Sequence, residues 1–285
     1  MTENTNPLHK YYRQPAIYIK LPSQGRYYDK QTYTPTETGE IPVLPMTAKD
    51  EMTFKTPDAM INGQATVDVI KSCVPNMLDP WKMVNYDTDC VLLAIRIATY
   101  GESMDITYSV PNSEVNQSSS VNLPALLEDL AKADIQDFTT TTKGFKVKIR
   151  PLDYKTLTKV QIARFEQQKM YGTISSSTLT EEEKQTAFAK SFETLNTVNF
   201  SLLLDSIQEI TTPDGNTVSD RQQIIEFVNN ADTVTVKEIQ EKLSDLRVQA
   251  QIKPIKVKAT DEQVKKGVPA TFEVPLTFDN SNFFG

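Results

Sequence analysis

The clearest helical pattern of the chain lies in DTDCVLLAIRIATYG, residues 87–101. Its apolar side chains recur at intervals of three and four residues, which predicts one helix with an apolar face. The sequence places Gly101 directly after Tyr100, and a glycine at this position commonly ends a helix. Asp87 and Asp89 stand where a helix N-terminus favours negative charge. We therefore expect a helix over residues 87–100, the best defined of the N-terminal half.

Short strands and turns flank this helix. Residues 16–20 alternate like a strand, and Pro22 with Gly25 predicts a turn into a second short strand. Residues 105–110 and 119–123 predict a hairpin with a long polar tip. Further helices are expected from Thr47, over residues 67–73 and from Pro124. The N-terminal half therefore mixes strands with helices.

Helices dominate after residues 143–152, which alternate between apolar and basic side chains as a half-buried strand does. Residues 153–171 and 181–207 read as long helices, and Thr180 with Glu183 predicts a capping box for the second. The remaining expected elements are a small hairpin around residues 213–215, helices capped by Ser219 and Thr235, and strands at residues 255–258 and 271–278. A pairing of residues 143–152 with 271–278 would join the two halves into one cooperative unit.

The whole pattern predicts an α+β fold in two parts, a mixed part over residues 1–150 and a mainly helical part over residues 151–285. The chain has 285 residues, of which 39% are hydrophobic, and this suffices for an apolar core. No apolar run approaches the roughly 18 residues of a membrane span, and the first residues lack the apolar region of a secretory signal. With only two cysteines, these features favour a reducing cytosol.

Side chains suited to catalysis are scarce. The single histidine, His9, lies in a polar tail, and the nine glycines form no phosphate-binding motif. Cys73 and Cys90 lie on apolar helix faces and are expected to be small buried hydrophobic residues. We therefore expect no catalytic residue, no metal site, no cofactor and no enzyme. A metal-dependent enzyme built on carboxylates stays as an alternative, because sequence spacing alone leaves oxygen-ligated Mg²⁺ open.

The stretch of residues 143–164 is strongly basic. It holds seven Lys and Arg residues and one acidic residue, Asp153, which gives a net charge of +6. Such a stretch attracts nucleic acid or an acidic protein surface, but a solvated strand and helix face has the same composition. A nucleic-acid-binding module that uses residues 143–164 is therefore the alternative function. The net charge of −7 over the whole chain argues against a general nucleic-acid coat.

Four segments resemble, in the same order, the tail baseplate hub family of T4-type contractile-tailed bacteriophages. They are LPSQGRYY at residues 21–28, IPVLPMTAKDEMTFKTPDAMINGQA at 41–65, the helix end Cys73-Val-Pro followed by DTDCVLLAIRIATYG, and the closing TFDNSNFFG at 277–285. The resemblance covers residues 17–125 well and the helical middle loosely.

The resemblance implies a non-enzymatic part in tail morphogenesis, as a permanent subunit or an assembly factor of the baseplate hub. It implies contacts with other phage baseplate or tail proteins, assembly in the host cytoplasm, and a place in the virion tail baseplate for a permanent subunit. No membrane contact is expected, nucleic acid is not the expected partner, and the oligomeric state stays open.

The family match also suggests which residues contact a partner. They lie in LPSQGRYY, in the helix of residues 87–100 and at the C-terminus, and are Leu21, Pro22, Gly25, Tyr27, Tyr28, Arg96, Tyr100, Phe278, Phe283 and Phe284. The three phenylalanines would form an interaction patch if exposed, or would fasten the C-terminus to the core if folded back.

Members of this family often carry CPxC-like pairs at the hairpin tip that here reads Ser109-Val110-Pro111-Asn112-Ser113, and again before the C-terminus. This chain has no cysteine at either place. If those pairs bind zinc in the relatives, packing alone must hold the hairpin here.

Overall fold

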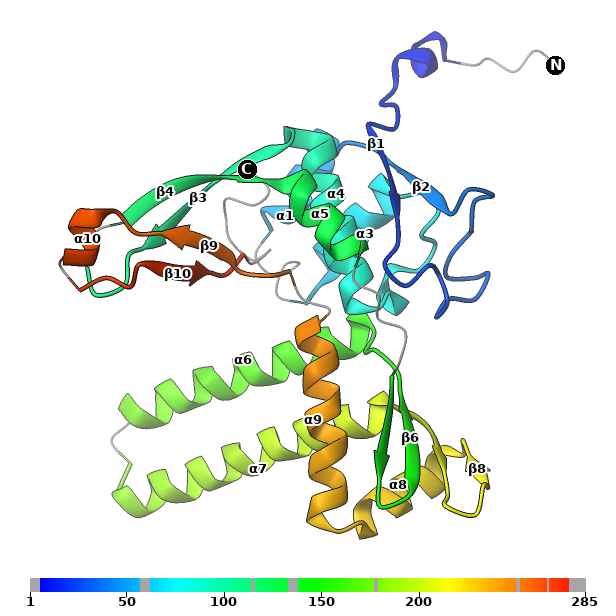
Figure 1. Ribbon diagram of the computed structural model, residues 1–285, viewed down its shortest axis with the longest axis vertical. Coiled ribbons are helices and arrows are strands. Elements are labelled where there is room, and N and C mark those ends of the chain that lie inside the picture. Colours follow the sequence, from blue (N-terminus) through cyan, green and yellow to red (C-terminus); the bar gives the residue numbers. More distant parts are fainter. Residues whose placement is uncertain are drawn as a thin grey trace.

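The computed structural model describes residues 6–56, 62–113, 116–132, 138–176, 179–249, 252–265 and 267–276. Helices and antiparallel strands occur throughout, so the predicted α+β fold class is confirmed. Figure 1 shows an upper body, built from segments near both ends of the chain, above a lower body of helices and a small sheet.

Helix α4 (Asn85–Tyr100) forms the centre of the upper body and confirms the strongest helix prediction. Its side chains at Cys90, Leu93 and Ile95 are fully buried, and Gly101 follows it with a φ of 95°. The elements around it are η1 (Pro7–Tyr11), β1 (Ile17–Lys20), β2 (Glu40–Val43), α1 (Ala48–Phe54), α3 (Gln64–Cys73), η2 (Pro80–Lys82), β3 (Ser103–Ser109), β4 (Asn116–Asn122) and α5 (Leu123–Ala131).

Of the short elements predicted for the upper body, the helix start at Thr47 is confirmed and one strand is not. Thr47 begins α1 with a capping box, in which the Asp50 N–H donates to the Thr47 hydroxyl and the Thr47 N–H donates to the Asp50 carboxylate. The second short strand expected directly after Pro22 and Gly25 is wrong, since residues 22–27 form successive turns. Strand β1 pairs instead with β2, because the intervening loop folds against α4 rather than beside β1.

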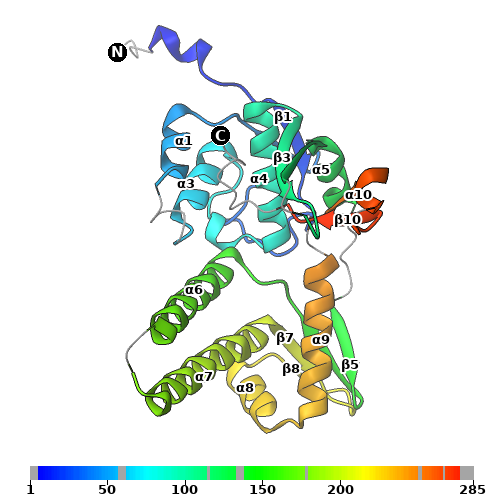
Figure 2. The ribbon, with the colours of Figure 1, turned by 90° about the vertical axis from the view of Figure 1, so that its left-hand side faces the viewer.

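The lower body contains a four-stranded antiparallel sheet in the order β5–β6–β7–β8. Its elements are β5 (Thr139–Thr142), β6 (Phe145–Ile149), α6 (Tyr154–Ser176), α7 (Glu181–Ser206), β7 (Ile207–Thr211), β8 (Thr217–Val218), α8 (Arg221–Asn230) and α9 (Thr233–Gln249). Helices α6 and α7 form a long antiparallel hairpin, and the predicted capping box of Thr180 and Glu183 begins α7. Figure 2 shows this hairpin beside α9 and α8.

Two helix caps of the lower body differ from the prediction. Asp220, not Ser219, caps α8 and accepts the N–H groups of Gln222 and Gln223, each at 3.0 Å. At the start of α9, Asp232 rather than Thr235 accepts backbone N–H groups, including that of Thr235 itself. In both cases a carboxylate is available, and it is a stronger acceptor than a hydroxyl.

After α9 the chain returns to the upper body through β9 (Ile255–Lys258), α10 (Asp261–Lys265) and β10 (Thr271–Val274). Strand β10 pairs with β9, while β6 pairs with β5 and β7, so the expected pairing of residues 143–152 with 271–278 is wrong. The nearer strand has the advantage, because closing a short loop costs less entropy than closing a long one.

Packing holds the β3–β4 hairpin against the returning segment. The rings of Tyr108 and Phe272 lie 5.8 Å apart, and the Asn112 side-chain amide donates to the Gly267 carbonyl at 3.2 Å. Val110 is buried at the hairpin tip. These contacts agree with a hairpin tip held by packing.

Two large apolar clusters follow from this course of the chain. The first combines residues of β1, β2, α3 and α4 with Val268, Phe272 and Val274. The second combines Val84 and Tyr86 with the small sheet, α7, α8 and α9. The start of α4 therefore reaches into the lower core, and the division predicted near residue 150 stays a prediction.

Candidate functional site

Asp87, in the first turn of α4, fastens the segment LPSQGRYY to the helix. Its carboxylate is 0% exposed. Oδ1 accepts the backbone N–H of Ser23 at 2.9 Å, and Oδ2 accepts the Tyr28 hydroxyl at 2.6 Å and also the Ser23 hydroxyl. The Tyr28 oxygen in turn accepts the N–H of Val84 at 3.1 Å. We call Asp87, Ser23 and Tyr28 the Asp87 node.

The Asp87 node is a buried polar network in an apolar core. Burial raises the pKa of Asp87 to about 6, while the hydrogen bonds from Ser23 and Tyr28 favour its charged form. Burial and the neighbouring carboxylate raise the pKa of Tyr28 well above its usual value. The two acids at the start of α4 were predicted as helix caps, but no side chain caps this helix, and Asp87 instead binds a segment 64 residues away.

The LPSQGRYY residues predicted to bind a partner make contacts within the chain. Leu21 and Pro22 are buried, and Gly25 lies against Tyr33. Tyr27 packs edge-on against Phe138, with 6.0 Å between ring centroids. Partner binding by this segment stays a prediction, and its observed contacts position the turn on α4.

Arg96 and Tyr100 lie one turn apart near the end of α4. The guanidinium carbon of Arg96 lies 4.4 Å from the Tyr100 ring centroid, and the Tyr100 hydroxyl donates to Glu51 at 2.9 Å. Tyr100 is 37% exposed. Among the described residues, Nε and Nη1 of Arg96 are buried without an acceptor, and burial lowers the pKa of Arg96. These unpaired buried donors cost free energy in the folded chain.

The remaining predicted contact residues, Phe278, Phe283 and Phe284, lie outside the described residues.

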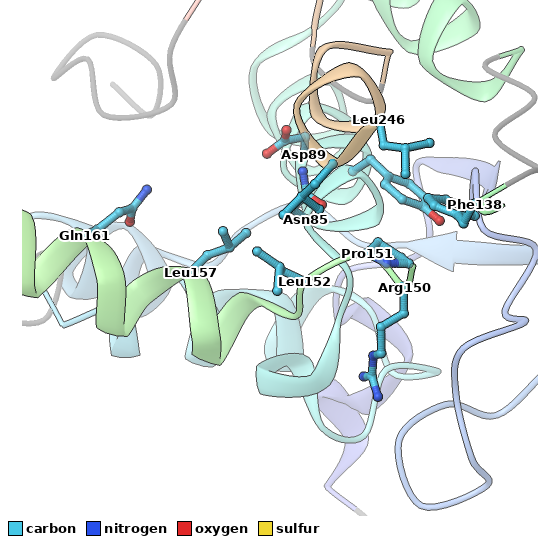
Figure 3. Close-up of a pocket in the computed structure, with 11 residues that line it drawn as sticks. Asn85, Asp89, Phe138, Arg150, Pro151, Leu152, Leu157, Gln161 and Leu246 are labelled. Atoms are coloured by element: carbon cyan, nitrogen blue, oxygen red, sulfur yellow. The ribbon is translucent and has the colours of Figure 1, made fainter. Parts of the chain in front are cut away.

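A cavity of about 200 Å³ lies where α4, α6, α9 and the link before α6 meet (Figure 3). Its lining joins apolar side chains such as Leu157 and Leu246 with the polar side chains of Asn85, Asp89 and Gln161. In Figure 3 the Arg150 side chain points away from Asp89. Burial raises the pKa of Asp89 to about 7. The sequence offered no signal for this cavity, because its walls come from distant segments.

The basic stretch of residues 143–164 runs from the turn before β6, through β6 and the link after it, into α6. Lys143 pairs with Asp232 at 2.7 Å, and this contact lowers the pKa of Asp232. Arg164 donates to Asn199 at 2.9 Å, and Arg150 lines the cavity. The arrangement therefore adds no support to the nucleic-acid alternative, which stays a prediction.

The cysteines match their predicted role as buried hydrophobic residues. Cys73 and Cys90 are both free and fully buried, and burial raises the pKa of the Cys73 thiol to about 11. Within the described ranges, no group of three or more His, Cys, Asp or Glu side chains is placed to hold a metal ion. No helix in those ranges is long and apolar enough to cross a membrane.

Gly25 offers a direct test of how tightly the turn fits. Its φ is 76°, and an added Cβ would lie 2.9 Å from the Tyr33 ring. Gly25→Ala is expected to lower the free energy of unfolding by about 2 kcal/mol, through backbone strain and overpacking. Gly39 has a similar φ of 73° but open space around it, so Gly39→Ala should cost only about 1 kcal/mol. Equal losses in urea denaturation would show that Tyr33 does not constrain the turn.

The family described as T4 bacteriophage base plate protein matches residues 15–273, which include the Asp87 node, the cavity and the whole second apolar cluster. No curated protein and no solved structure matches the chain. Because the family match extends over nearly the whole described chain, the protein belongs to the T4 bacteriophage base plate protein family.

Proposed function

We propose that this baseplate protein is a non-enzymatic component of the baseplate hub, as a subunit or an assembly factor. The observation that carries the proposal is the family match over residues 15–273. The hub assignment rests in addition on the ordered resemblance of residues 21–28, 41–65 and 87–101 to the hub family. A hub component acts by binding other phage tail proteins, and its surface must supply the contacts.

The end of α4 is the contact site that we propose from the predicted residues. Arg96 is half-buried, and Tyr100 is partly exposed beside it. Arg and Tyr are enriched among residues that dominate binding energy at interfaces. Together they offer a positive charge and an aromatic ring to another tail protein.

The N-terminal segment is a second proposed contact element, which the sequence did not single out. Arg13 anchors it by donating to the carbonyls of Pro45 at 2.6 Å and Ser72 at 2.7 Å, and by pairing with Asp50 at 3.2 Å. Figure 1 shows η1 leading away from the body beyond this anchor. The exposed apolar side chains there are Leu8, Tyr11 and Tyr12, with exposed fractions of 60%, 73% and 54%. Such side chains are typical of a segment that docks on another protein.

Quantitative mass spectrometry of mature tails and of partially assembled hubs tests this proposal. We expect the chain in the partial hubs, because a hub component joins before the tail is complete. A fixed copy number in mature tails as well would identify a permanent subunit of the virion baseplate. Presence in the partial hubs alone would identify an assembly factor that acts in the host cytoplasm. Absence from both preparations would refute a role in the hub.

A further inference from the structure

Helices α6 and α7 extend beyond the rest of the lower body as a two-helix hairpin (Figures 1 and 2). Near its base, Leu152, Val160 and Leu202 form a small apolar cluster. Farther out the two helices contact each other, with the Ser191 hydroxyl donating to Gln167 at 2.7 Å. A hairpin of this kind has two open faces, each of which a further helix could cover.

One of these faces carries an apolar groove. Tyr171, Phe192 and Leu195 line a groove of about 510 Å³, and the polar side chains of Arg164, Gln168 and Asn199 lie beside them. Tyr171 stacks on Phe188 with 4.4 Å between ring centroids, yet 49% of Tyr171 and 59% of Phe192 remain exposed. Aromatic side chains exposed together on one groove indicate an interaction surface.

Charge is distributed unevenly along the hairpin. The tip half, residues 165–176 and 181–193, has five acidic and three basic residues, a net charge of −2. The base half, residues 154–164 and 194–206, has three basic residues and one acidic residue, a net charge of +2. Two such hairpins placed side by side in opposite directions would bring each acidic tip beside a basic base.

We propose that the groove binds the same hairpin of a second copy of this chain, antiparallel, to form a four-helix bundle. A two-fold axis makes the groove its own partner, as in other isologous dimers. The hairpin tip is where α6 ends at Ser176 and α7 begins at Glu181. At a rise of 1.5 Å per residue along each helix, Tyr171 lies about 8 Å, Phe192 about 17 Å and Leu195 about 21 Å from this tip. An axis about 15 Å from the tip therefore places Tyr171 of one copy beside Leu195 of the other. The proposal is independent of the hub assignment.

Sedimentation velocity of the full chain over a wide range of concentrations tests the association. We expect a monomer–dimer equilibrium, which Phe192→Ser should weaken at least about tenfold, because a central aromatic side chain commonly dominates an interface. Met170→Ser is the matched control, since Met170 is 46% exposed on the same hairpin but does not line the groove. It should leave the dissociation constant unchanged. Far-UV circular dichroism and thermal melting check that both variants fold.

Single-cysteine crosslinking tests the antiparallel arrangement, because Cys73 and Cys90 are buried. In Gln168→Cys the introduced thiol lies near the proposed axis, about 12 Å from the tip, so the two copies should crosslink efficiently. In Gln185→Cys it lies about 6 Å from the tip, and the two thiols would be about 18 Å apart along the bundle. Crosslinking of Gln185→Cys as efficient as that of Gln168→Cys would refute the antiparallel arrangement.

A chain that stays monomeric at every concentration would also overturn the proposal, because it would refute self-association. In that case, a block of tail assembly by Phe192→Ser but not by Met170→Ser would show that the groove binds a different tail protein.

Discussion

Replacing Asp87 with alanine is expected to lower the free energy of unfolding by about 4 kcal/mol. The change leaves the Ser23 N–H, the Ser23 hydroxyl and the Tyr28 hydroxyl without their shared acceptor in a buried site. It also detaches the turn of residues 22–27 from α4. Urea denaturation followed by circular dichroism measures the loss.

Two further variants make the test of Asp87 specific. Asp68 is exposed on α3 and accepts a hydrogen bond from the Gln64 side-chain amide at 2.7 Å, so Asp68→Ala should change stability by less than about 0.5 kcal/mol. Asp87→Asn keeps an oxygen acceptor and carries no charge, so it should lose less than Asp87→Ala and allow the comparison if the alanine variant fails to fold. A loss for Asp87→Ala no larger than that for Asp68→Ala would show that the node does not stabilise the protein.

The second large effect concerns Asp89 and pH. Its pKa is about 7 in the folded chain, against an ordinary value of 3.8. Between these values the unfolded chain releases the proton that the folded chain retains, so the Asp89 contribution to stability falls as the pH rises. Asp89→Asn removes this titration. At about pH 8 the variant is expected to be more stable than the parent by about 3 kcal/mol, a figure reduced for partial exposure of the carboxylate.

Urea denaturation at a series of pH values checks this prediction. The gain from Asp89→Asn should be close to zero at about pH 4 and should reach its full size at about pH 8. Asp87 also has a raised pKa, and it contributes the same pH dependence to parent and variant, so their difference isolates Asp89. Asp129→Asn, at an exposed position on α5, is the control and should show no such trend. A pH-independent difference between parent and Asp89→Asn would contradict the raised pKa of this carboxylate.

The elements that could be predicted from sequence are those whose signals are local. Helix α4 has its apolar period and its terminal glycine within one segment, and α7 has its capping box at Thr180. The strand β5 consists of four threonines, and their burial depends on partners in β6 that the local sequence does not reveal. Likewise, β10 could in principle pair with the distant β6 or with the nearer β9, and its own sequence does not decide between them.

The sites required information that one sequence does not contain. The resemblance drew attention to LPSQGRYY, but it could not distinguish a partner contact from the internal attachment of Ser23 and Tyr28 to Asp87. The cavity at Asp89 and the groove at Phe192 each arise from residues that only the folded chain brings together. A single-sequence pattern describes each helix but not the surface that two helices share.

The return of the chain to the upper body has a consequence for folding during synthesis. Val268, Phe272, Val274 and Leu276 complete the first apolar cluster, whereas the last buried residue of the second cluster is Leu246. Since a ribosome releases the chain from its N-terminus onward, the lower core can close while the upper core still lacks its final strands. We therefore expect the body that is begun first to be finished last, only after translation has passed residue 276.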